Sequence, residues 1–375
     1  MKILFTRFPL ESIPHGGAEQ QVISLATGLA AKGHAVTYAG SCTALASAFK
    51  EAHLPVSDLD IGPPPVSKKT IARFLVRKKA MRRSLETMLE RFKELDAIVM
   101  LSLTEKLLLT DLAAARGIKV LWIEHDPVGR WLTKNPWLKL LKKQSALATT
   151  VTVSELSRIQ YLEMDWDQKK TVAIPNGIAD TWFTKQPNTR TLASTGRSEN
   201  GLHLGCVARL AEEKGIDLLL RAVANIEHVT LDIVGEGPEE RALKERSERL
   251  GLGHRVRFLG RRSDIAAFYR QIDALVLPSR TIDPFGMVVA EAMAMGVPCL
   301  ITDACGIVSH LEATRDIFVV KRNDADAITK GIQWLADNEN RASLSTNGAK
   351  AAKQQFAVSA MVDRYETLFT GRPTH

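Results

Sequence analysis

Short apolar runs alternate along the chain with longer segments in which apolar residues recur at the spacing of one helix face. One helical segment, 18–33, ends at Gly33, and glycine is typical of helix ends. Strands are expected over 2–8, 34–40, 97–101, 119–125, 149–154, 171–175, 202–208, 229–235, 256–260, 274–279, 298–302 and 317–320. This alternation predicts parallel sheets with helices on both faces.

A polar stretch without periodicity, residues 187–201, interrupts the alternation, which then restarts. We interpret it as a linker or a surface loop. The chain is therefore predicted to be α/β, with two Rossmann-like, doubly wound domains that face each other across a cleft. One is expected over 1–180 and the other over 181–350. A last helix around 349–370 would fill most of 351–375 and pack back on the N-terminal domain.

Composition narrows the class of protein. Hydrophobic residues make up 45% of the chain and charged residues 25%, as in ordinary globular proteins. Apolar runs such as 97–103 are too short to span a membrane, and the opening segment MKILFTRF is more typical of a strand than of a signal peptide. The four cysteines form no CxxC pair and no zinc spacing, so reduced thiols are expected. We predict a cytoplasmic protein that is neither secreted by the usual signal nor embedded in a membrane.

The net charge of +8 is concentrated in one segment. Residues 68–93 contain ten Lys or Arg and two Glu, whereas the rest of the chain carries 40 basic and 40 acidic residues. Helical spacing predicts a basic amphipathic helix whose apolar residues are Ile71, Phe74, Leu75, Met81, Leu85, Met88, Leu89 and Phe92. Such a helix can lie on an anionic membrane surface, and the alternative is a core-packed helix with a solvated basic face. The aromatic and basic segment 131–143 favours the membrane, and without a nucleic-acid motif we expect no nucleic acid partner.

Ligands of open α/β sheets bind at the carboxyl ends of strands, so the loops there are candidate sites. After the first strand, Gly16 and Gly17 directly precede a helix, whose first N–H groups can bind phosphate. The alternative for this pair is a simple flexible turn. At the end of the strand over 119–125, His125 is a further candidate, either as a structural histidine or with Asp126 as its partner.

Two cations, Arg209 and Lys214, follow the first strand of the second half and offer a site for a diphosphate. Alternatively, they pair with Glu212 and Glu213 on the surface. One strand later, Gly235 begins a GxG turn with a nucleotide contact in reach. The third glycine of a dinucleotide fingerprint is missing there, and the absence of a P-loop sequence counts against an ATPase.

Two acids, Asp283 and Glu291, lie in a stretch that is otherwise small and apolar. A buried carboxylate needs a partner, because burying it alone is costly. Asp283 before Pro284 fits a helix N-cap. Glu291 would pair with a lysine or a backbone donor, or accept the two vicinal hydroxyls of a ribose. The N–H groups expected at the helix start, available to a phosphate, are those of Phe285, Gly286 and Met287.

Three DxD strings also occur, at 58–60, 165–167 and 324–326. Such pairs can hold Mn²⁺ or Mg²⁺ under a diphosphate. None of the three follows a predicted strand beside the loops above, so we interpret them as surface acids and expect no metal.

The order and spacing of these motifs resemble glycosyltransferase family 4, a family of retaining, nucleotide-sugar-dependent enzymes with the GT-B fold. The motifs are HGGAE, ARLAEEKG, VGEGPE and FGMVVAEAMAMGVPC, and the resemblance is strongest over 203–312. It implies that the C-terminal domain mainly binds the donor and the N-terminal domain the acceptor. It also implies that no metal or other cofactor is needed.

The family's residue roles can be carried over to this chain. The resemblance implies that Glu291 holds the ribose and that Asp283 contacts the donor sugar. His125 would lie near the reacting sugar. The residues implied to bind the diphosphate are Arg209, Lys214, Gly16 and Gly17.

The sequence departs from the family pattern at two places. The family usually has Glu where this chain has Asp283, which is one methylene shorter. Ala304, Cys305 and Gly306 stand where a Gly-Gly pair is usual, so the sugar pocket or the loop beside it is expected to differ in shape.

The resemblance implies a retaining, hexosyltransferase-type enzyme that moves a sugar from a nucleotide-diphosphate sugar to a glycan or lipid-linked acceptor. Bacterial cell-surface polysaccharide or lipopolysaccharide synthesis is the expected setting, with the basic helix on the inner face of the cell membrane. The alternatives are a glycoside phosphorylase, a sugar-phosphate transferase, or an inactive nucleotide-sugar-binding protein on the same fold.

Overall fold

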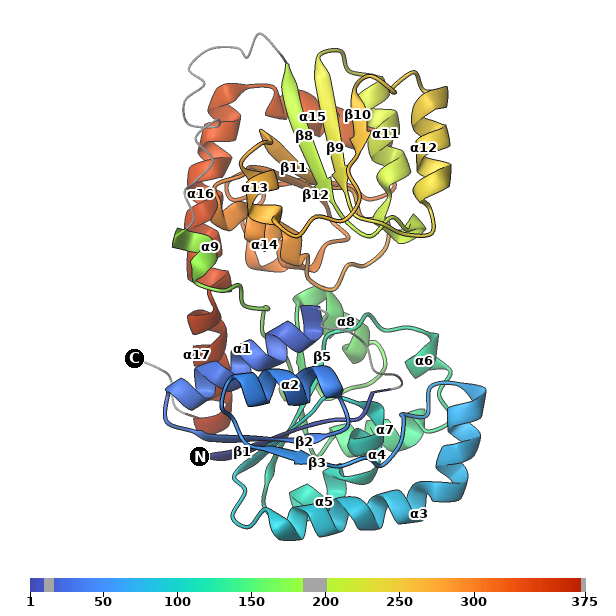
Figure 1. The fold of residues 1–375 in the computed structure, drawn as a ribbon, viewed down its shortest axis with the longest axis vertical. Coiled ribbons are helices and arrows are strands. Elements are labelled where there is room, and N and C mark those ends of the chain that lie inside the picture. Colours follow the sequence, from blue (N-terminus) through green and yellow to red (C-terminus); the bar gives the residue numbers. More distant parts are fainter. Residues whose placement is uncertain (10–16, 185–200, 372–375) are drawn as a thin grey trace. The chain divides into compact units, whose positions relative to one another are not determined.

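A computed structural model of the chain describes residues 1–9, 17–184 and 201–371 (Figure 1). The chain forms two compact units. The N-terminal unit comprises Met1–Gly177 together with Val358–His375, and the C-terminal unit comprises Ile178–Ala357. Each unit is an α/β layered structure built around one parallel sheet, and each is described by itself below.

The sheet of the N-terminal unit has seven strands in the order β3-β2-β1-β4-β5-β6-β7. They are β1 (Lys2–Arg7), β2 (Ala35–Gly40), β3 (Val56–Asp58), β4 (Ala97–Met100), β5 (Lys119–Glu124), β6 (Thr149–Thr152) and β7 (Thr171–Ala173). All neighbouring pairs are parallel. Six of these strands follow the predicted pattern, whereas β3 was not predicted because it is short, polar and at the edge of the sheet.

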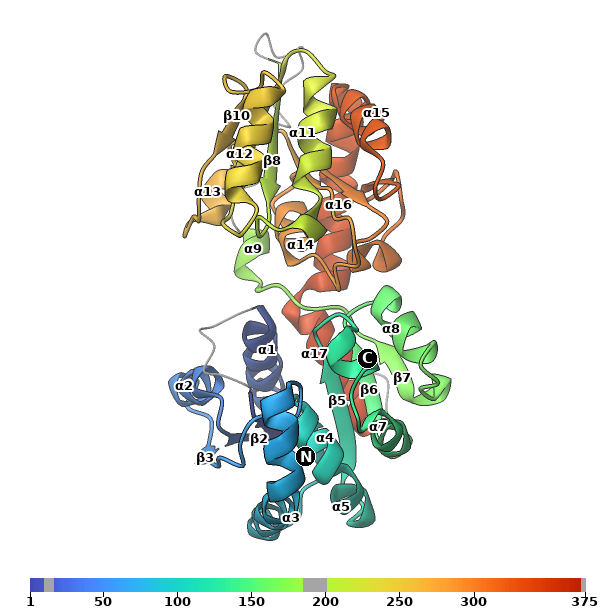
Figure 2. The ribbon, with the colours of Figure 1, turned by 90° about the vertical axis from the view of Figure 1, so that its right-hand side faces the viewer.

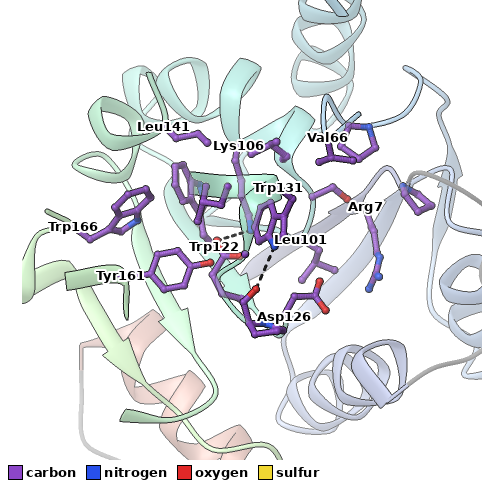
Figure 3. Close-up of a pocket in the computed structure, with 18 residues that line it drawn as sticks. Arg7, Val66, Leu101, Lys106, Trp122, Asp126, Trp131, Leu141, Tyr161 and Trp166 are labelled. Atoms are coloured by element: carbon purple, nitrogen blue, oxygen red, sulfur yellow. Dashed lines mark hydrogen bonds and ion pairs between the residues drawn. The ribbon is translucent and has the colours of Figure 1, made fainter. Parts of the chain in front are cut away.

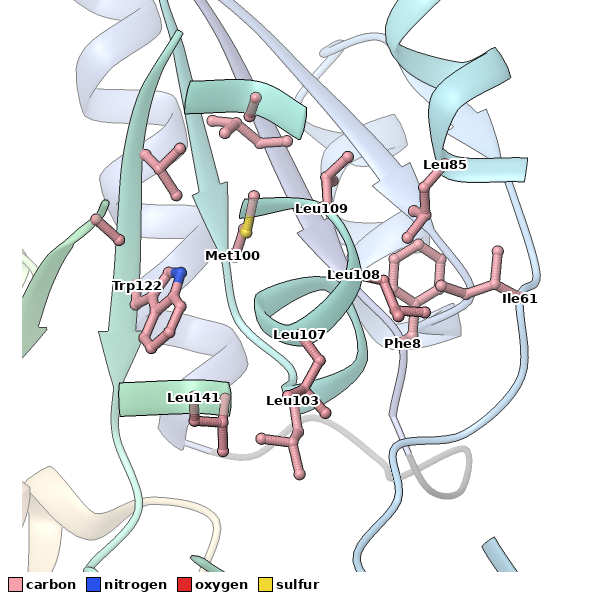
Figure 4. Packing of buried hydrophobic residues seen from close by; sticks show 14 of the residues in the cluster. Phe8, Ile61, Leu85, Met100, Leu103, Leu107, Leu108, Leu109, Trp122 and Leu141 are labelled. Carbon is pink, nitrogen blue, oxygen red and sulfur yellow. The ribbon is translucent and has the colours of Figure 1, made fainter. Parts of the chain in front are cut away.

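Both faces of this sheet are buried, which explains why its strands are apolar at successive positions. Ile3 and Phe5 point into one cluster and Leu4 into the other. The first cluster is covered by α1 (Gly17–Ala31), α2 (Thr43–Glu51) and α17 (Val358–Thr370). The second is covered by α3 (Lys68–Arg91), α4 (Leu103–Leu108), α5 (Thr110–Ala115) and α7 (Leu138–Ser145) (Figure 2, Figure 4).

The sheet of the C-terminal unit has six parallel strands in the order β10-β9-β8-β11-β12-β13. They are β8 (Leu202–Val207), β9 (Val229–Val234), β10 (Val256–Phe258), β11 (Ala274–Leu277), β12 (Cys299–Thr302) and β13 (Phe318–Val320). On one side, α11 (Ile216–Ala224), α12 (Glu240–Arg249) and α15 (Ala325–Leu335) share a core. On the other lie α13 (Ile265–Tyr269) and α14 (Met287–Ala294), with α16 (Asn338–Phe356) packed on α14 (Figure 1).

The remaining short helices connect these layers. They are α6 (Arg130–Thr133), α8 (Glu155–Leu162), η1 (Gln168–Lys170), α9 (Thr181–Thr184), η2 (Glu212–Lys214) and η3 (Gly306–His310). No helix within the described ranges is long and apolar enough to cross a bilayer. The polar stretch 187–201 lies almost wholly outside the described residues.

The two doubly wound sheets that the sequence predicts are present, and each has a topological switch point. The first strand of each unit has neighbours on both sides: β1 lies between β2 and β4, and β8 lies between β9 and β11. At such a point the connections from neighbouring strands run in opposite directions, and ligands of such folds bind there, at the carboxyl edge of the sheet.

The segment expected to form one last helix, around 349–370, contains the end of α16 and all of α17, and α17 packs on α1 of the N-terminal unit. The segment forms two helices, α16 and α17, because Ala357 between them has an extended backbone with ψ of 142°. Ala357 forms an isolated parallel bridge with Ile178, whose N–H donates to the Phe356 carbonyl at 2.7 Å. No Gly or Pro marks the break in the sequence.

The start of α4 contains a buried acid. Ser102 caps the helix, and the Glu105 carboxylate accepts hydrogen bonds from the backbone N–H groups of Leu101, at 3.1 Å, and Ser102, at 2.6 Å. Burial outweighs these bonds and raises the pKa of Glu105 to about 8. The folded chain therefore favours the protonated carboxyl, so ionisation of Glu105 lowers the free energy of unfolding.

Because the folded pKa of Glu105 lies above its unfolded value, its contribution to stability is complete below about pH 4.5 and is lost as the pH rises through about 8. Glu105→Gln keeps an accepting oxygen and cannot ionise. Between pH 5 and pH 8 we expect the variant's free energy of unfolding to fall less than the parent's, by on the order of 3 kcal/mol. Urea denaturation at several pH values measures this, and parallel pH curves for the two proteins would contradict it.

Candidate functional site

The candidate site in the C-terminal unit is built from four loops at the carboxyl edge of its sheet. The loops follow β8, β9, β11 and β12, and backbone hydrogen bonds join each to the next in space. Leu210 N–H donates to the Glu236 carbonyl at 2.9 Å, and Arg280 N–H donates to the Glu213 carbonyl at 2.8 Å. Asp283 N–H donates to the Ala304 carbonyl at 2.9 Å. The side chains of this edge therefore stand on a connected backbone frame.

Gly235 is required by this frame. Its φ is 136°, and a Cβ at this position would lie 1.9 Å from the carbonyl oxygen of Ala208. The first position of the GxG turn after β9 therefore requires glycine, because the loop after β8 approaches its backbone closely. This gives Gly235 a structural role, and contact with a nucleotide stays a prediction.

Lys214 and Asp283 meet at the switch point between β8 and β11. The Lys214 ammonium donates to the Asp283 carboxylate at 2.5 Å, and these side chains are 23% and 12% exposed. The predicted alternative of a surface pair with Glu212 or Glu213 is therefore wrong for Lys214. An ammonium has three donors, so Lys214 can hold Asp283 and an anionic ligand at the same time.

Arg209 forms the surface pair that the sequence analysis gave as the alternative to a diphosphate site. Its guanidinium pairs with Glu213, four residues on, and its side chain is 65% exposed. A backbone hydrogen bond and then the bond from Arg209 lower the pKa of the Glu213 carboxyl. An exposed pair of this kind contributes little to stability, so Arg209 can exchange its partner for a ligand at low cost.

The start of α14 differs from the sequence prediction. Asp283 is not the N-cap; the helix begins at Met287, with Gly286 in the capping position. Asp283 instead bridges two loops, because its carbonyl also accepts from Gly306 N–H at 2.8 Å. Phe285 packs its ring on Phe356, with centroids 5.4 Å apart, so only its backbone is available to a ligand.

Gly286 fits only because it lacks a side chain. Its φ is 96°, and a Cβ would lie 2.4 Å from the Cys305 sulfur. Cys305 is buried, its thiol donates to the Phe285 carbonyl at 3.2 Å, and burial raises the pKa of this thiol well above its usual value. The cysteine therefore fills the space beside the helix start, where the family pattern has glycine.

Glu291 is half-buried on α14 and has a partner from a neighbouring helix. The Tyr269 hydroxyl lies 3.3 Å from its carboxylate and 3.1 Å from the Val288 carbonyl. Burial, followed by the charge of Glu291, raises the pKa of Tyr269 well above its usual value. Tyr269 was not predicted as part of the site, because no local motif links it to Glu291.

The other predicted residues belong to the N-terminal unit. Gly16 lies outside the described residues, and Gly17 is the first residue of α1, where an added Cβ would meet no atom within 4 Å. His125 follows β5, and neither ring nitrogen has a hydrogen-bond partner among the described residues. Burial, then the charges of Arg7 and Lys106, lower the pKa of His125 to about 3, so the imidazole is neutral at physiological pH.

Sequence reasoning missed a second concentration of polar groups beside His125. The Lys106 ammonium pairs with the Glu124 carboxylate at 2.8 Å, and these side chains are only 5% and 10% exposed. They line a cavity of about 510 Å³ with Trp122, Trp131, Tyr161 and Trp166 (Figure 3). The sequence offers only a weak signal, because Lys106 precedes three leucines but follows Thr104 and Glu105.

The described part of the chain contains no group of three or more His, Cys, Asp or Glu side chains arranged to hold a metal ion. Two of the DxD strings have ordinary roles. Asp165 pairs with Lys142 at 2.8 Å, and Asp324 caps α15 by accepting from Ala327 N–H at 2.9 Å.

Comparison with known families matches both halves of the chain. Residues 15–182 match the family described as Glycosyltransferase Family 4, and residues 188–352 match Glycosyl transferases group 1. Two relatives in Rhizobium meliloti, the lipopolysaccharide core biosynthesis glycosyltransferases LpsE and LpsD, are each 32% identical. The matches cover 44% of this chain in both cases, and 49% of LpsE and 48% of LpsD, so they span about half the length of these relatives.

Among solved structures, Anabaena HepE in complex with UDP is similar over 99% of this chain and 100% of HepE. The TM-score is 0.80 and the sequence identity is 21%. This likeness establishes the fold and confirms the predicted GT-B class.

The close contact between Gly286 and Cys305 can be tested through its effect on stability. Gly286→Ala combines a strained backbone with a steric conflict, so we expect the free energy of unfolding to drop by about 1–3 kcal/mol. Adding Cys305→Ala removes the conflict and should recover part of that loss, while the backbone strain remains. Chemical denaturation measures both, with Gly17→Ala as the matched control, since its Cβ meets nothing. Equal stability of Gly286→Ala and the parent would contradict the packing.

Proposed function

The chain belongs to glycosyltransferase family 4, and from this premise we propose that it is a retaining glycosyltransferase. It moves a sugar from a nucleotide-diphosphate sugar to a hydroxyl of a glycan or lipid-linked acceptor. The observation that carries the proposal is the pairing of Lys214 with Asp283 at the switch point, where a cation and a hydrogen-bond acceptor stand together. The UDP bound to HepE supports a nucleotide-linked donor.

We infer that the donor binds along the carboxyl edge of the C-terminal sheet. Lys214 and Arg209 neutralise the diphosphate. Glu291 accepts the hydroxyls of the ribose. Asp283, already aligned by Lys214, contacts the donor sugar.

The reaction follows from these positions. The bond between the anomeric carbon and the diphosphate oxygen breaks, and the negative charge that develops on the leaving group is stabilised by Lys214 and Arg209. The acceptor hydroxyl attacks from the same face, and its proton passes to the departing diphosphate oxygen.

We propose bacterial cell-surface polysaccharide or lipopolysaccharide synthesis as the setting. The names of LpsE and LpsD, lipopolysaccharide core biosynthesis glycosyltransferases, support it. We place the enzyme in the cytoplasm, at the inner face of the cell membrane.

The membrane proposal rests on the two-sided character of α3. Its inner face packs on the core through Phe74 and Met81, as the core-packed alternative expected. On its outer side, however, Leu75 is 54% and Val76 is 85% exposed, next to the basic side chains of the same helix. Trp137 packs on Phe74 with ring centroids 4.7 Å apart. This contact brings the aromatic and basic segment 131–143 beside α3. Exposed apolar residues among cations suit an anionic bilayer surface.

Nucleotide binding and transfer should both depend on the switch-point residues. We expect Lys214→Ala and Glu291→Ala to lower transfer by about 100-fold or more, because each removes a contact to the charged donor. In a thermal-shift screen with UDP-, GDP-, ADP- and dTDP-sugars, the nucleotide that raises the parent's melting temperature should no longer do so in Lys214→Ala.

Lys350→Ala, a lysine exposed on α16, is the matched control and should behave like the parent. Full transfer activity in both site variants would refute the assignment. Consumption of the donor with release of a nucleoside monophosphate would instead indicate a sugar-phosphate transferase. Turnover of a glycoside with inorganic phosphate, without consumption of any nucleotide sugar, would indicate a glycoside phosphorylase. Binding without any turnover would indicate an inactive binding protein.

Membrane binding should depend on charge. We expect the protein to sediment with anionic liposomes, more weakly as salt rises, because exposed charges are screened. The double variant Lys78→Glu and Lys79→Glu should bind at least about tenfold more weakly, since each lysine near the surface contributes about 1 kcal/mol. Lys350→Glu with Lys353→Glu changes the charge equally on α16 and should have little effect. Equal binding to neutral liposomes would argue against the proposal.

A further inference from the structure

The hydroxyl of Tyr269 lies close to two acceptors of α14. It is 3.1 Å from the Val288 carbonyl oxygen and 3.3 Å from an oxygen of the Glu291 carboxylate. Residues three apart on a helix lie on the same face, which is why one donor can reach both acceptors. Burial and then the charge of Glu291 raise the pKa of the phenol well above its usual value. The hydroxyl therefore keeps its proton at physiological pH and acts as a donor to α14.

The ring of Tyr269 is held in place by its surroundings. Tyr269 is the last residue of α13, and it is fully buried. Its ring centroid lies 6.0 Å from that of Trp182 on α9 and 6.2 Å from that of Phe268. A ring packed in this way cannot swing aside without disturbing its neighbours, so the hydroxyl keeps one position beside Glu291.

Glu291 gains from a fixed neighbour more than an exposed acid would. It is half-buried on a helix that is otherwise apolar, and its side chain has several rotatable bonds. Freezing a glutamate side chain costs up to about 1.5–2 kcal/mol of rotamer freedom. A group that is already ordered before the ligand arrives avoids part of this cost at binding. The carboxylate has about four lone-pair sites, so one bond from Tyr269 leaves room for the two hydroxyls of a ribose.

We propose that Tyr269 is a positioning residue that fixes the Glu291 carboxylate for the ribose of the donor; this rests on the proposed glycosyltransferase function. Tyr269 acts through Glu291. Its contribution to affinity therefore requires both the carboxylate and the ribose hydroxyl that the carboxylate accepts. A tyrosine with only a structural role would hold α13 beside α14 and would affect all nucleotides alike. The two roles differ in a coupling that a double-mutant cycle measures.

The test measures nucleotide binding to the full chain by isothermal titration calorimetry. The probes are UDP, GDP and ADP, each compared with its 2′-deoxy form, together with dTDP. We expect the parent to prefer the ribose form of the nucleotide that it binds, because the 2′-hydroxyl donates to Glu291. Tyr269→Phe should weaken binding of the ribose form about three- to tenfold, as expected for the loss of one hydrogen bond. The preference over the 2′-deoxy form should shrink at the same time.

The double-mutant cycle and a matched control separate positioning from structure. In the Glu291→Ala background, Tyr269→Phe should cause no further loss of affinity. Tyr38→Phe is the control, since Tyr38 is also fully buried and its hydroxyl also donates to a backbone carbonyl, that of Arg7, at 3.2 Å. Tyr38 belongs to the N-terminal unit, so this variant should bind each probe like the parent.

The outcomes distinguish this inference from the proposed function. Unchanged affinity in Tyr269→Phe, or the same loss with and without Glu291, would overturn the inference and leave the proposed function standing. A parent that binds a 2′-deoxy form or dTDP at least as tightly as any ribose form would do the same. Failure of the parent to bind any of the probes would refute the proposed function, and the inference with it.

Discussion

The candidate donor site depends on the hydrogen bonds that join neighbouring loops at the carboxyl edge of the C-terminal sheet. Asp283 is held on both sides of its peptide, by Ala304 and by Gly306, before its side chain meets Lys214. The loop carrying Lys214 is tied to the loop after β11 through Glu213 and Arg280. A short ion pair between groups on different loops needs this prior order, because otherwise the entropy of aligning two side chains would cancel most of its benefit.

The N-terminal unit keeps polar groups in places where apolar ones would pack more simply. Lys106 and Glu124 are nearly inaccessible, and a buried ion pair is weak support for stability on its own. His125 adds an imidazole whose nitrogens are buried and which stays neutral. A charged pair retained beside a cavity of about 510 Å³ is more simply explained by a ligand than by folding, since ligand pockets combine apolar walls with a few placed polar groups.

The sequence was a good guide wherever local pattern decides the structure. Strands buried on both faces, such as β5 and β11, were predicted from their apolar runs. The helix α3 was predicted from its basic amphipathic pattern. The edge strand β3 could not be recognised because Val56–Asp58 is short and only partly buried. The pairing of Lys214 with Asp283 could not be predicted either, because it depends on β8 and β11 being neighbours. The local spacing of residues does not determine the order of strands in a sheet. The same holds for Tyr269 beside Glu291 and for the aromatic cavity, whose walls come from separate segments.

The way α17 completes the N-terminal unit has a consequence for biosynthesis. Met361, Val362 and Phe369 of this helix are buried in the same cluster as Leu25 and Leu29 of α1, yet the whole of the other unit separates them in the chain. On the ribosome, residues 1–177 emerge first but lack the helix that seals their core, whereas the second unit is complete once residue 357 has left the exit tunnel. The unit made first must therefore be the last to finish folding, and its uncovered apolar face is the surface that a chaperone would meet during translation.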